Sequence, residues 1–305
     1  MFAFKSEQKI FDIGRVKVGG QPGQLPTVLI GSIFHRGHRI VVDSKTGLFD
    51  KDRAKRLIFV QHELSEKTGN PLMIDVVGET SEALIRYMEF ISEVTEAPFL
   101  PNGPDATIRL QAVRYAASAG LLERMVYNSI NFTATEQEFA ALKEYRVKAA
   151  IVQAFNPRNP RIDGMRQQLL GYQGKEGLLE RAFKSGIEKP LILSPILDIP
   201  SIGVAAGAIF TLKNELGLPT GSAPLGVIST WKKSGEEKEF SKRLGRVAAA
   251  TLCQCMGANF LIYGSIGRAK DIFPSCALID AIIAYSMTAI GVKPLTKNHP
   301  LYKIL

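Results

Sequence analysis

Residues 72–75 read Leu-Met-Ile-Asp, and similar apolar runs end on a polar side chain elsewhere in the chain. Residues 124–128 read Arg-Met-Val-Tyr-Asn, and residues 190–198 read Pro-Leu-Ile-Leu-Ser-Pro-Ile-Leu-Asp. A strand buried on both faces is expected to be apolar throughout, so a carboxylate or carboxamide at its end needs a reason. Several such ends predict a ring of polar groups above a parallel sheet, where (β/α)8 barrels bind their ligands.

Strand-like and helix-like runs alternate along the 305 residues of the chain. Strict alternation predicts a parallel α/β sheet, and eight units favour a closed TIM barrel over an open, doubly wound sheet. A turn is expected at residues 219–222, before a weak seventh strand. The expected strands are residues 27–34, 71–77, 98–101, 124–129, 148–155, 190–197, 224–228 and 259–263.

Helix-start signals precede several of the segments between these strands. Asp50 is expected to cap a helix that Gly69 ends, and both Thr135-x-x-Glu138 and Ser234-x-x-Glu237 have the spacing of a capping box. The last helix is expected from about residue 273 to residue 290. Residues 1–26 are expected to be an N-terminal extension that closes the bottom of a single barrel domain spanning residues 1–305.

The composition restricts the partners and the compartment. A formal charge of +9 suits an anionic partner, such as a phosphate, a polyglutamate tail or an acidic protein, although solvated lysines explain it more simply. Basic residues form only short runs without interleaved aromatic residues, which argues against nucleic acid. Three cysteines and no signal peptide predict a cytoplasmic protein without disulfides. The longest apolar stretch, residues 277–292, contains Asp280 and predicts a buried helix with no direct membrane insertion.

Polar residues and glycines at the strand ends are the candidate ligand-binding groups. Some also have a purely structural interpretation, because Asp75 and Asp198 could cap helices and Asn102 and Asn128 could be turn residues. No metal site is predicted, because His35 and His38 lack an obvious third ligand. The candidates are Asp75, Asn102, Asn128, Gln153, Asp198, Ser222 and Gly264. Gly264 begins an expected Gly-Ser-Ile-Gly turn, at a place where barrels often hold phosphate.

Three strand-end runs resemble those of pterin-binding barrels. The run Leu197-Asp-Ile-Pro-Ser-Ile-Gly203 resembles the Leu-Asp-Pro-Gly-Ile-Gly of dihydropteroate synthases. Tyr127-Asn-Ser-Ile-Asn131 and Asp75-Val-Val-Gly-Glu-Thr80 resemble runs of pterin methyltransferases and synthases. Along the whole chain, residues 8–23, 26–38 and 42–50 are similar to the H subunit family of tetrahydromethanopterin S-methyltransferase and its bacterial relatives, which include the methylcobalamin:tetrahydrofolate methyltransferase of glycine betaine demethylation.

This resemblance implies methyl transfer between a methylcobalamin-bearing corrinoid protein and N5 of tetrahydrofolate, with tetrahydromethanopterin as the alternative pterin. It implies a catalytic set of Asp75, Asn128 and Asp198. Asp198 would bind the 2-amino and N3 edge of the ring and Asn128 a mixed donor and acceptor edge. Asp75 would contact the ring or orient Asn128, and Asn102 stands where synthases often carry Asp. A homodimer that docks a separate corrinoid protein is also implied.

Two other functions stay open. A condensing enzyme of the dihydropteroate synthase kind would need a Lys after strand seven, and residues 220–223 contain none, although Arg268 lies near strand eight. A non-catalytic protein that binds a pterin or a corrinoid within a larger assembly would share all the ring contacts. Related methyltransferases carry an Asn near N5 after strand seven, which this sequence lacks, so no residue is assigned to proton transfer at N5.

Overall fold

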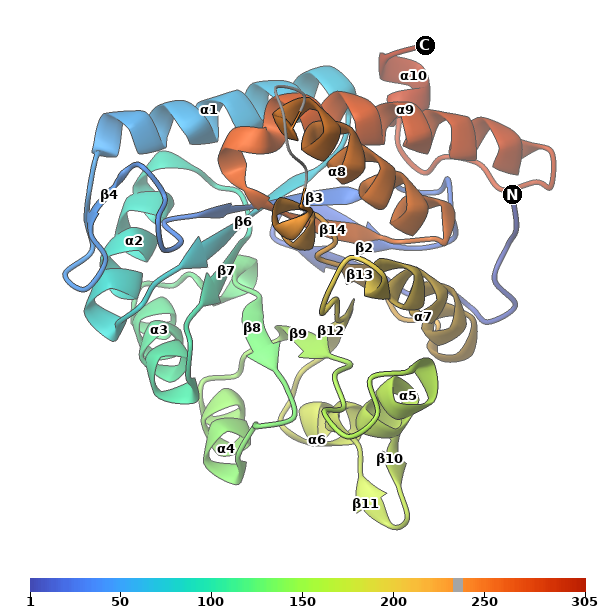
Figure 1. Cartoon of the computed structure of the whole chain (residues 1–305). Coiled ribbons are helices and arrows are strands. Elements are labelled where there is room, and N and C mark those ends of the chain that lie inside the picture. Colours follow the sequence, from blue (N-terminus) through green and yellow to red (C-terminus); the bar gives the residue numbers. More distant parts are fainter. Residues whose placement is uncertain (233–237) are drawn as a thin grey trace.

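The computed structural model describes residues 1–232 and 238–305, and a closed parallel barrel lies at its centre (Figure 1). The strands follow one another around the barrel in chain order, and β14 closes it by pairing with β3. The predicted (β/α)8 architecture is therefore confirmed. The barrel strands are β3 (Val28–Ile33), β6 (Leu72–Val77), β7 (Phe99–Asn102), β8 (Tyr127–Ile130), β9 (Ala149–Gln153), β12 (Lys189–Ser194), β13 (Thr220–Ser222) and β14 (Phe260–Ser265).

Helices surround the barrel, and their ends follow the local signals of the sequence. Asp50 accepts a hydrogen bond from the Arg53 N–H, and Gly69 ends the first helix at a φ of 83°. The helices are α1 (Lys51–Thr68), α2 (Ser81–Val94), α3 (Ala106–Ser118), α4 (Glu136–Glu144), α5 (Ile162–Leu170), α6 (Leu178–Lys184), α7 (Ser201–Leu216), α8 (Lys238–Cys255), α9 (Ala269–Thr288) and α10 (Pro300–Lys303).

The two predicted capping boxes have different outcomes. Thr135 caps α4 by accepting a hydrogen bond from the Glu138 N–H, as predicted. The Glu138 carboxylate makes no reciprocal bond, because it is buried against Arg109 and Tyr127 instead. The second box, Ser234-x-x-Glu237, lies outside the described residues. The start of α9 is also earlier than predicted, because the 3-10 turn η3 (Ile266–Arg268) leads directly into it.

The seventh strand is the main correction to the sequence prediction. Residues 220–222, the expected turn, form β13, whereas the expected strand at residues 224–228 is a turn that continues into the 3-10 helix η2 (Val227–Thr230). Gly and Ser are typical turn residues, which explains the error. In the barrel, a Cβ on Gly221 would come within 2.1 Å of the Phe260 carbonyl oxygen. The glycine is needed because β13 and β14 approach closely.

The N-terminal extension closes one end of the barrel. It forms an antiparallel hairpin of β1 (Ile10–Ile13) and β2 (Val16–Gly19). Ile13, Val16 and Val18 belong to the same buried cluster as the inward-facing residues of the barrel strands. The predicted closing role is confirmed. Two further hairpins, β4–β5 (Val41–Asp43 and Leu48–Phe49) and β10–β11 (Gly171–Tyr172 and Lys175–Glu176), follow β3 and α5 (Figure 1).

Among the described residues, one helical stretch, Ile266–Thr288, is long and apolar enough to cross a membrane by length and composition alone. Half of its apolar window is buried in the protein. Asp280, within α9, accepts hydrogen bonds from the backbone and hydroxyl of Thr27 and from the amides of Asn70 and Gln254. These contacts are those of a helix packed on the barrel, as Asp280 predicts.

The Asp280 carboxyl gives the stability a defined pH dependence. Burial raises its pKa from 3.8 to about 6, and the hydrogen bonds from Thr27, Asn70 and Gln254 oppose this shift. Its contribution to stability is therefore present below pH 3.8 and lost as the pH rises through about 6. Relative to a non-titrating Asp280→Asn variant, we expect the wild-type free energy of unfolding to be about 1 kcal/mol larger at pH ~5 than at pH ~7.5. Urea denaturation at both values measures this difference, and a difference independent of pH would contradict it.

Candidate active site

A polar layer lies at the carboxyl ends of the barrel strands. Alternate residues of a barrel strand face the interior, so residues two apart lie on the same face. The interior cluster includes Met73 of β6, Leu100 of β7, Ile151 of β9 and Val126, which directly precedes β8. Two positions further along the same strands stand Asp75, Asn102, Asn128 and Gln153. The sequence alternation therefore places these four polar side chains in the next inward-facing layer, where the predicted ring was expected.

Asp75 is the centre of this layer and is 3% exposed. The Asn102 and Asn128 amides donate to its Oδ1 at 3.0 and 3.2 Å, and the Ser32 hydroxyl donates to its Oδ2 at 2.6 Å. These residues come from the adjacent strands β3, β6, β7 and β8. The sequence prediction that Asp75 orients Asn128 is consistent with this geometry. Ser32 was not predicted, although it lies two residues after the inward-facing Ile30 and could have been found from that spacing.

The electrostatics of Asp75 reflect its surroundings. Burial raises the pKa of its carboxyl, while the hydrogen bonds from Ser32, Asn102 and Asn128 and the charge of His35 oppose the shift. Because each amide donates one N–H to Asp75, each keeps a carbonyl oxygen and a second N–H that no other described residue uses. The cluster therefore offers a ligand two oriented amides, each able to accept and to donate.

The buried ion pair of Arg109 and Glu138 contacts the chain next to Asn102 and Asn128. The Arg109 guanidinium donates to the Gly103 carbonyl, the Tyr127 hydroxyl and the Glu138 carboxylate, each at 3.1 Å. The Tyr127 hydroxyl also donates to the Glu138 carboxylate. Gly103 follows Asn102, and Tyr127 precedes Asn128. The ion pair thus holds the backbone beside both amides.

The remaining predicted site residues make no hydrogen bond with the Asp75 cluster. Gln153 is half-buried at the end of β9, in the same inward-facing layer. Asp198 is exposed, and its Oδ1 accepts from the Ser201 N–H at 2.9 Å at the start of α7, as a capping residue would. Ser222 is fully buried and donates its hydroxyl to the Ser194 carbonyl. Gly264 has a φ of 74°, and a Cβ there would come within 2.9 Å of Arg268 Nη1.

The two histidines after β3 stack on each other with ring centroids 4.6 Å apart. His38 Nδ1 accepts a hydrogen bond from the Phe34 N–H, so this nitrogen is engaged. Within residues 1–232 and 238–305, no three His, Cys, Asp or Glu side chains gather as a metal would require.

Comparison with known proteins identifies the family. The model of the family described as tetrahydromethanopterin S-methyltransferase MtrH subunit matches residues 6–295. The chain belongs to this family. The H subunit of tetrahydromethanopterin S-methyltransferase from Methanothermobacter thermautotrophicus is 40% identical over the full length of both chains. The H subunit of the putative methyltransferase mtx from Methanosarcina barkeri is 38% identical over 99% of both. The resemblance seen in the sequence is thereby confirmed.

Solved structures show the same fold for this MtrH family member. A Yersinia pestis dihydropteroate synthase with a bound pterine-sulfa conjugate superimposes with a TM-score of 0.59, covering 90% of this chain and 98% of that one, at 13% identity. A Xanthomonas albilineans dihydropteroate synthase gives a TM-score of 0.57 at 17% identity, with 90% and 98% covered. At these identities the likeness concerns the barrel architecture.

In this MtrH family member, the segment after strand seven is poor in polar side chains that could contact a ligand. β13 ends at Ser222, and residues 223–232 read Ala-Pro-Leu-Gly-Val-Ile-Ser-Thr-Trp-Lys. This segment contains no Asn, Asp or Glu. Residues 220–232 at the end of strand seven therefore offer neither an amide nor a carboxylate side chain.

Proposed function

We propose that this protein transfers a methyl group between a corrinoid carried by a partner protein and N5 of a tetrahydropterin. The observation that carries the proposal is the Asp75 cluster, which presents the amides of Asn102 and Asn128 in a member of a methyltransferase family. The edge of a pterin ring alternates hydrogen-bond donors and acceptors. Oriented carboxamides match such an edge, because each can donate and accept.

The corrinoid would supply an electrophilic methyl group, and the residues of this chain would position its acceptor. In the displacement, the carbon–cobalt bond breaks, its electron pair stays on cobalt, and a carbon–nitrogen bond forms at N5, which releases a proton. Alignment of the two reacting atoms is the main contribution that a protein makes to such a step. Asn102 and Asn128 would hold the ring, and Asp75 would fix both amides. Asp198 stays a predicted ligand of the 2-amino edge.

Two tetrahydropterins are candidates for the methyl acceptor. The sequence resemblance puts tetrahydrofolate first, whereas the names of the full-length relatives favour tetrahydromethanopterin. We take tetrahydromethanopterin as the proposed substrate because family membership rests on these relatives. The ring contacts would serve both pterins, so discrimination would fall to the part of the pterin outside the ring.

The test is a methyl transfer assay with the purified chain. Methylcobalamin, or a methylated corrinoid protein, is mixed with tetrahydromethanopterin and, in parallel, with tetrahydrofolate. We expect methylated tetrahydromethanopterin to form with the larger kcat/KM. Faster transfer to tetrahydrofolate would reverse the order of the pterins, and no transfer in either direction with either pterin would overturn the proposed function.

The partners and the compartment remain proposals of the same kind. The reaction requires a corrinoid protein to dock over the carboxyl ends of the barrel strands. A homodimer and a cytoplasmic location, both predicted from the sequence, are kept as proposals. A condensing enzyme is not favoured, because the dihydropteroate synthases resemble this chain at only 11–19% identity, far below the methyltransferase relatives.

A further inference from the structure

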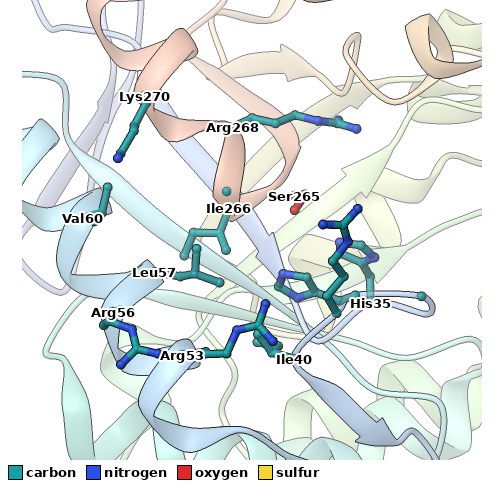
Figure 2. A pocket seen from close by; sticks show the side chains of 14 residues that line it. His35, Ile40, Arg53, Arg56, Leu57, Val60, Ser265, Ile266, Arg268 and Lys270 are labelled. Atoms are coloured by element: carbon teal, nitrogen blue, oxygen red, sulfur yellow. The ribbon is translucent and has the colours of Figure 1, made fainter. Parts of the chain in front are cut away.

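A cavity of about 660 Å³ is lined by residues from two separate parts of the chain, among them Arg53 and Arg268 (Figure 2). One wall is the loop after β3 together with the first turns of α1, and the other is the end of β14 with η3 and the start of α9. Since β3 also provides Ser32 and lies next to β6, the cavity adjoins the polar layer of the barrel. Its volume is within the range of small-molecule sites.

The lining of this cavity is strongly cationic. The lining contains no Asp or Glu. Five of its side chains are positively charged, namely Arg39, Arg53, Arg56, Arg268 and Lys270. Figure 2 shows Arg53 and Arg56 on the α1 side of the cavity and Arg268 and Lys270 on the other side. Gathering like charges in a partly enclosed space is unfavourable unless an anion joins them.

Little of this charge is neutralised by the described part of the chain. Arg53 lies 4.0 Å from Asp50, which already caps α1. For Arg39, Arg56, Arg268 and Lys270, no carboxylate among residues 1–232 and 238–305 lies within ion-pairing distance. Burial lowers the pKa of Arg268, and the charge of Arg246 lowers it further, while the charge of Glu239 opposes the shift.

Two residues connect the cavity with the Asp75 cluster. Ser265 lines the cavity and is the register partner of Ser32, whose hydroxyl donates to Asp75. The Arg268 side chain extends from the cavity wall to the end of β14, where its Nη1 would lie 2.9 Å from a Cβ on Gly264. A single ligand could therefore place a ring at the Asp75 cluster and an anionic group among the arginines.

We infer that this cavity binds the acidic tail of the tetrahydropterin whose ring lies at the Asp75 cluster. The inference rests on the proposed function. The tail of tetrahydromethanopterin carries a phosphodiester and carboxylates, and that of tetrahydrofolate carries carboxylates. Arginine forks bind phosphate and carboxylate oxygens in pairs. The cavity would thus take the part of the substrate that the barrel interior cannot hold.

The test compares two ligands that share the pterin ring. Dissociation constants are measured by calorimetry for tetrahydromethanopterin and for a tetrahydropterin without the acidic tail. We expect Arg53→Ala and Arg268→Ala, which alter opposite walls, each to weaken binding of the tailed pterin about tenfold. Binding of the tail-free pterin should change less than about twofold, since these arginines would not contact the ring. Arg114→Ala, on the exposed face of α3, is the matched control and should change neither constant.

Inorganic pyrophosphate serves as a second probe, because it has the charge of the tail without the ring. It should compete with the tailed pterin in the wild type, and each arginine variant should weaken this competition. Equal losses of affinity for the two pterins, or no loss of affinity in either variant, would overturn the inference. These readouts need no turnover. Absence of methyl transfer would therefore sink the proposed function alone, whereas equal affinity for the two pterins would sink the tail site alone.

Discussion

Replacing Asp75 by alanine is expected to lower kcat/KM for methyl transfer by at least about 100-fold. The carboxylate accepts hydrogen bonds from Asn102, Asn128 and Ser32, so its loss frees both amides to rotate. Each hydrogen bond to a charged group is worth roughly 1.5–3 kcal/mol, and about 1.4 kcal/mol corresponds to a factor of ten. Losing the orientation of two ligand-binding amides therefore predicts this magnitude. Steady-state kinetics and pterin affinity both measure it.

Ser32→Ala is the matched control for this substitution. It removes one of the three hydrogen bonds to Asp75 but leaves both amides attached, so we expect less than a tenfold loss. Asp75→Asn keeps the volume but turns an N–H toward at least one donor, so its activity should stay low. Because Asp75 is buried and its ionised form is penalised, neither Asp75 variant should unfold the protein. Asp75→Ala activity within about threefold of the wild type would refute the assigned role.

Replacing Arg109 by methionine is expected to lower the free energy of unfolding by about 3–5 kcal/mol. Arg109 is 5% exposed and Glu138 is 1% exposed, so the substitution leaves a buried carboxylate without its cation. The Gly103 carbonyl also loses its donor. Because Gly103 and Tyr127 flank the two amides, pterin affinity should fall together with stability. Urea denaturation and pterin titration measure the two effects.

The double variant Arg109→Met with Glu138→Leu separates loss of charge balance from loss of packing. Removing both charges eliminates the uncompensated carboxylate, so the double variant should regain more than half of the lost stability. Pterin affinity should remain reduced, because the Gly103 carbonyl still lacks its donor. A double variant no more stable than the single variant would show that the arginine acts through packing alone.

Much of the fold follows from local signals in the sequence. The strand β6 and the helix α1 are where the apolar run, the Asp50 cap and the Gly69 stop predict them. The seventh strand is the exception. Thr220-Gly-Ser222 has the composition of a turn, and only the neighbouring β12 and β14 make it a strand. Local propensity is a weak guide where close packing against a neighbour decides the conformation.

The candidate site was predictable where the strand period applied. Asp75, Asn102 and Asn128 follow inward-facing apolar residues at a spacing of two, and the structure joins them in one cluster. The spacing of two does not predict the positions of Asp198 and Ser222. The first is on an exposed loop, and the second donates to the backbone of the adjacent strand. The cationic cavity was not predicted, because Arg268 of η3 comes from the far end of the chain from the arginines of the β3 loop and α1.

By itself, the sequence determined the barrel, its family and the polar strand ends, because these depend on residues close together in the chain. In β6, Asp75 follows the inward-facing Met73 at a spacing of two, so the sequence alone places a polar side chain in the next inward-facing layer. The tertiary structure decided which polar groups share a hydrogen bond and which charges line one cavity. Barrel closure brings β3 beside β6 and β14, so that Ser32 reaches Asp75 and Arg53 faces the cavity that Arg268 lines. Such contacts follow from the closed parallel register, which no local pattern specifies.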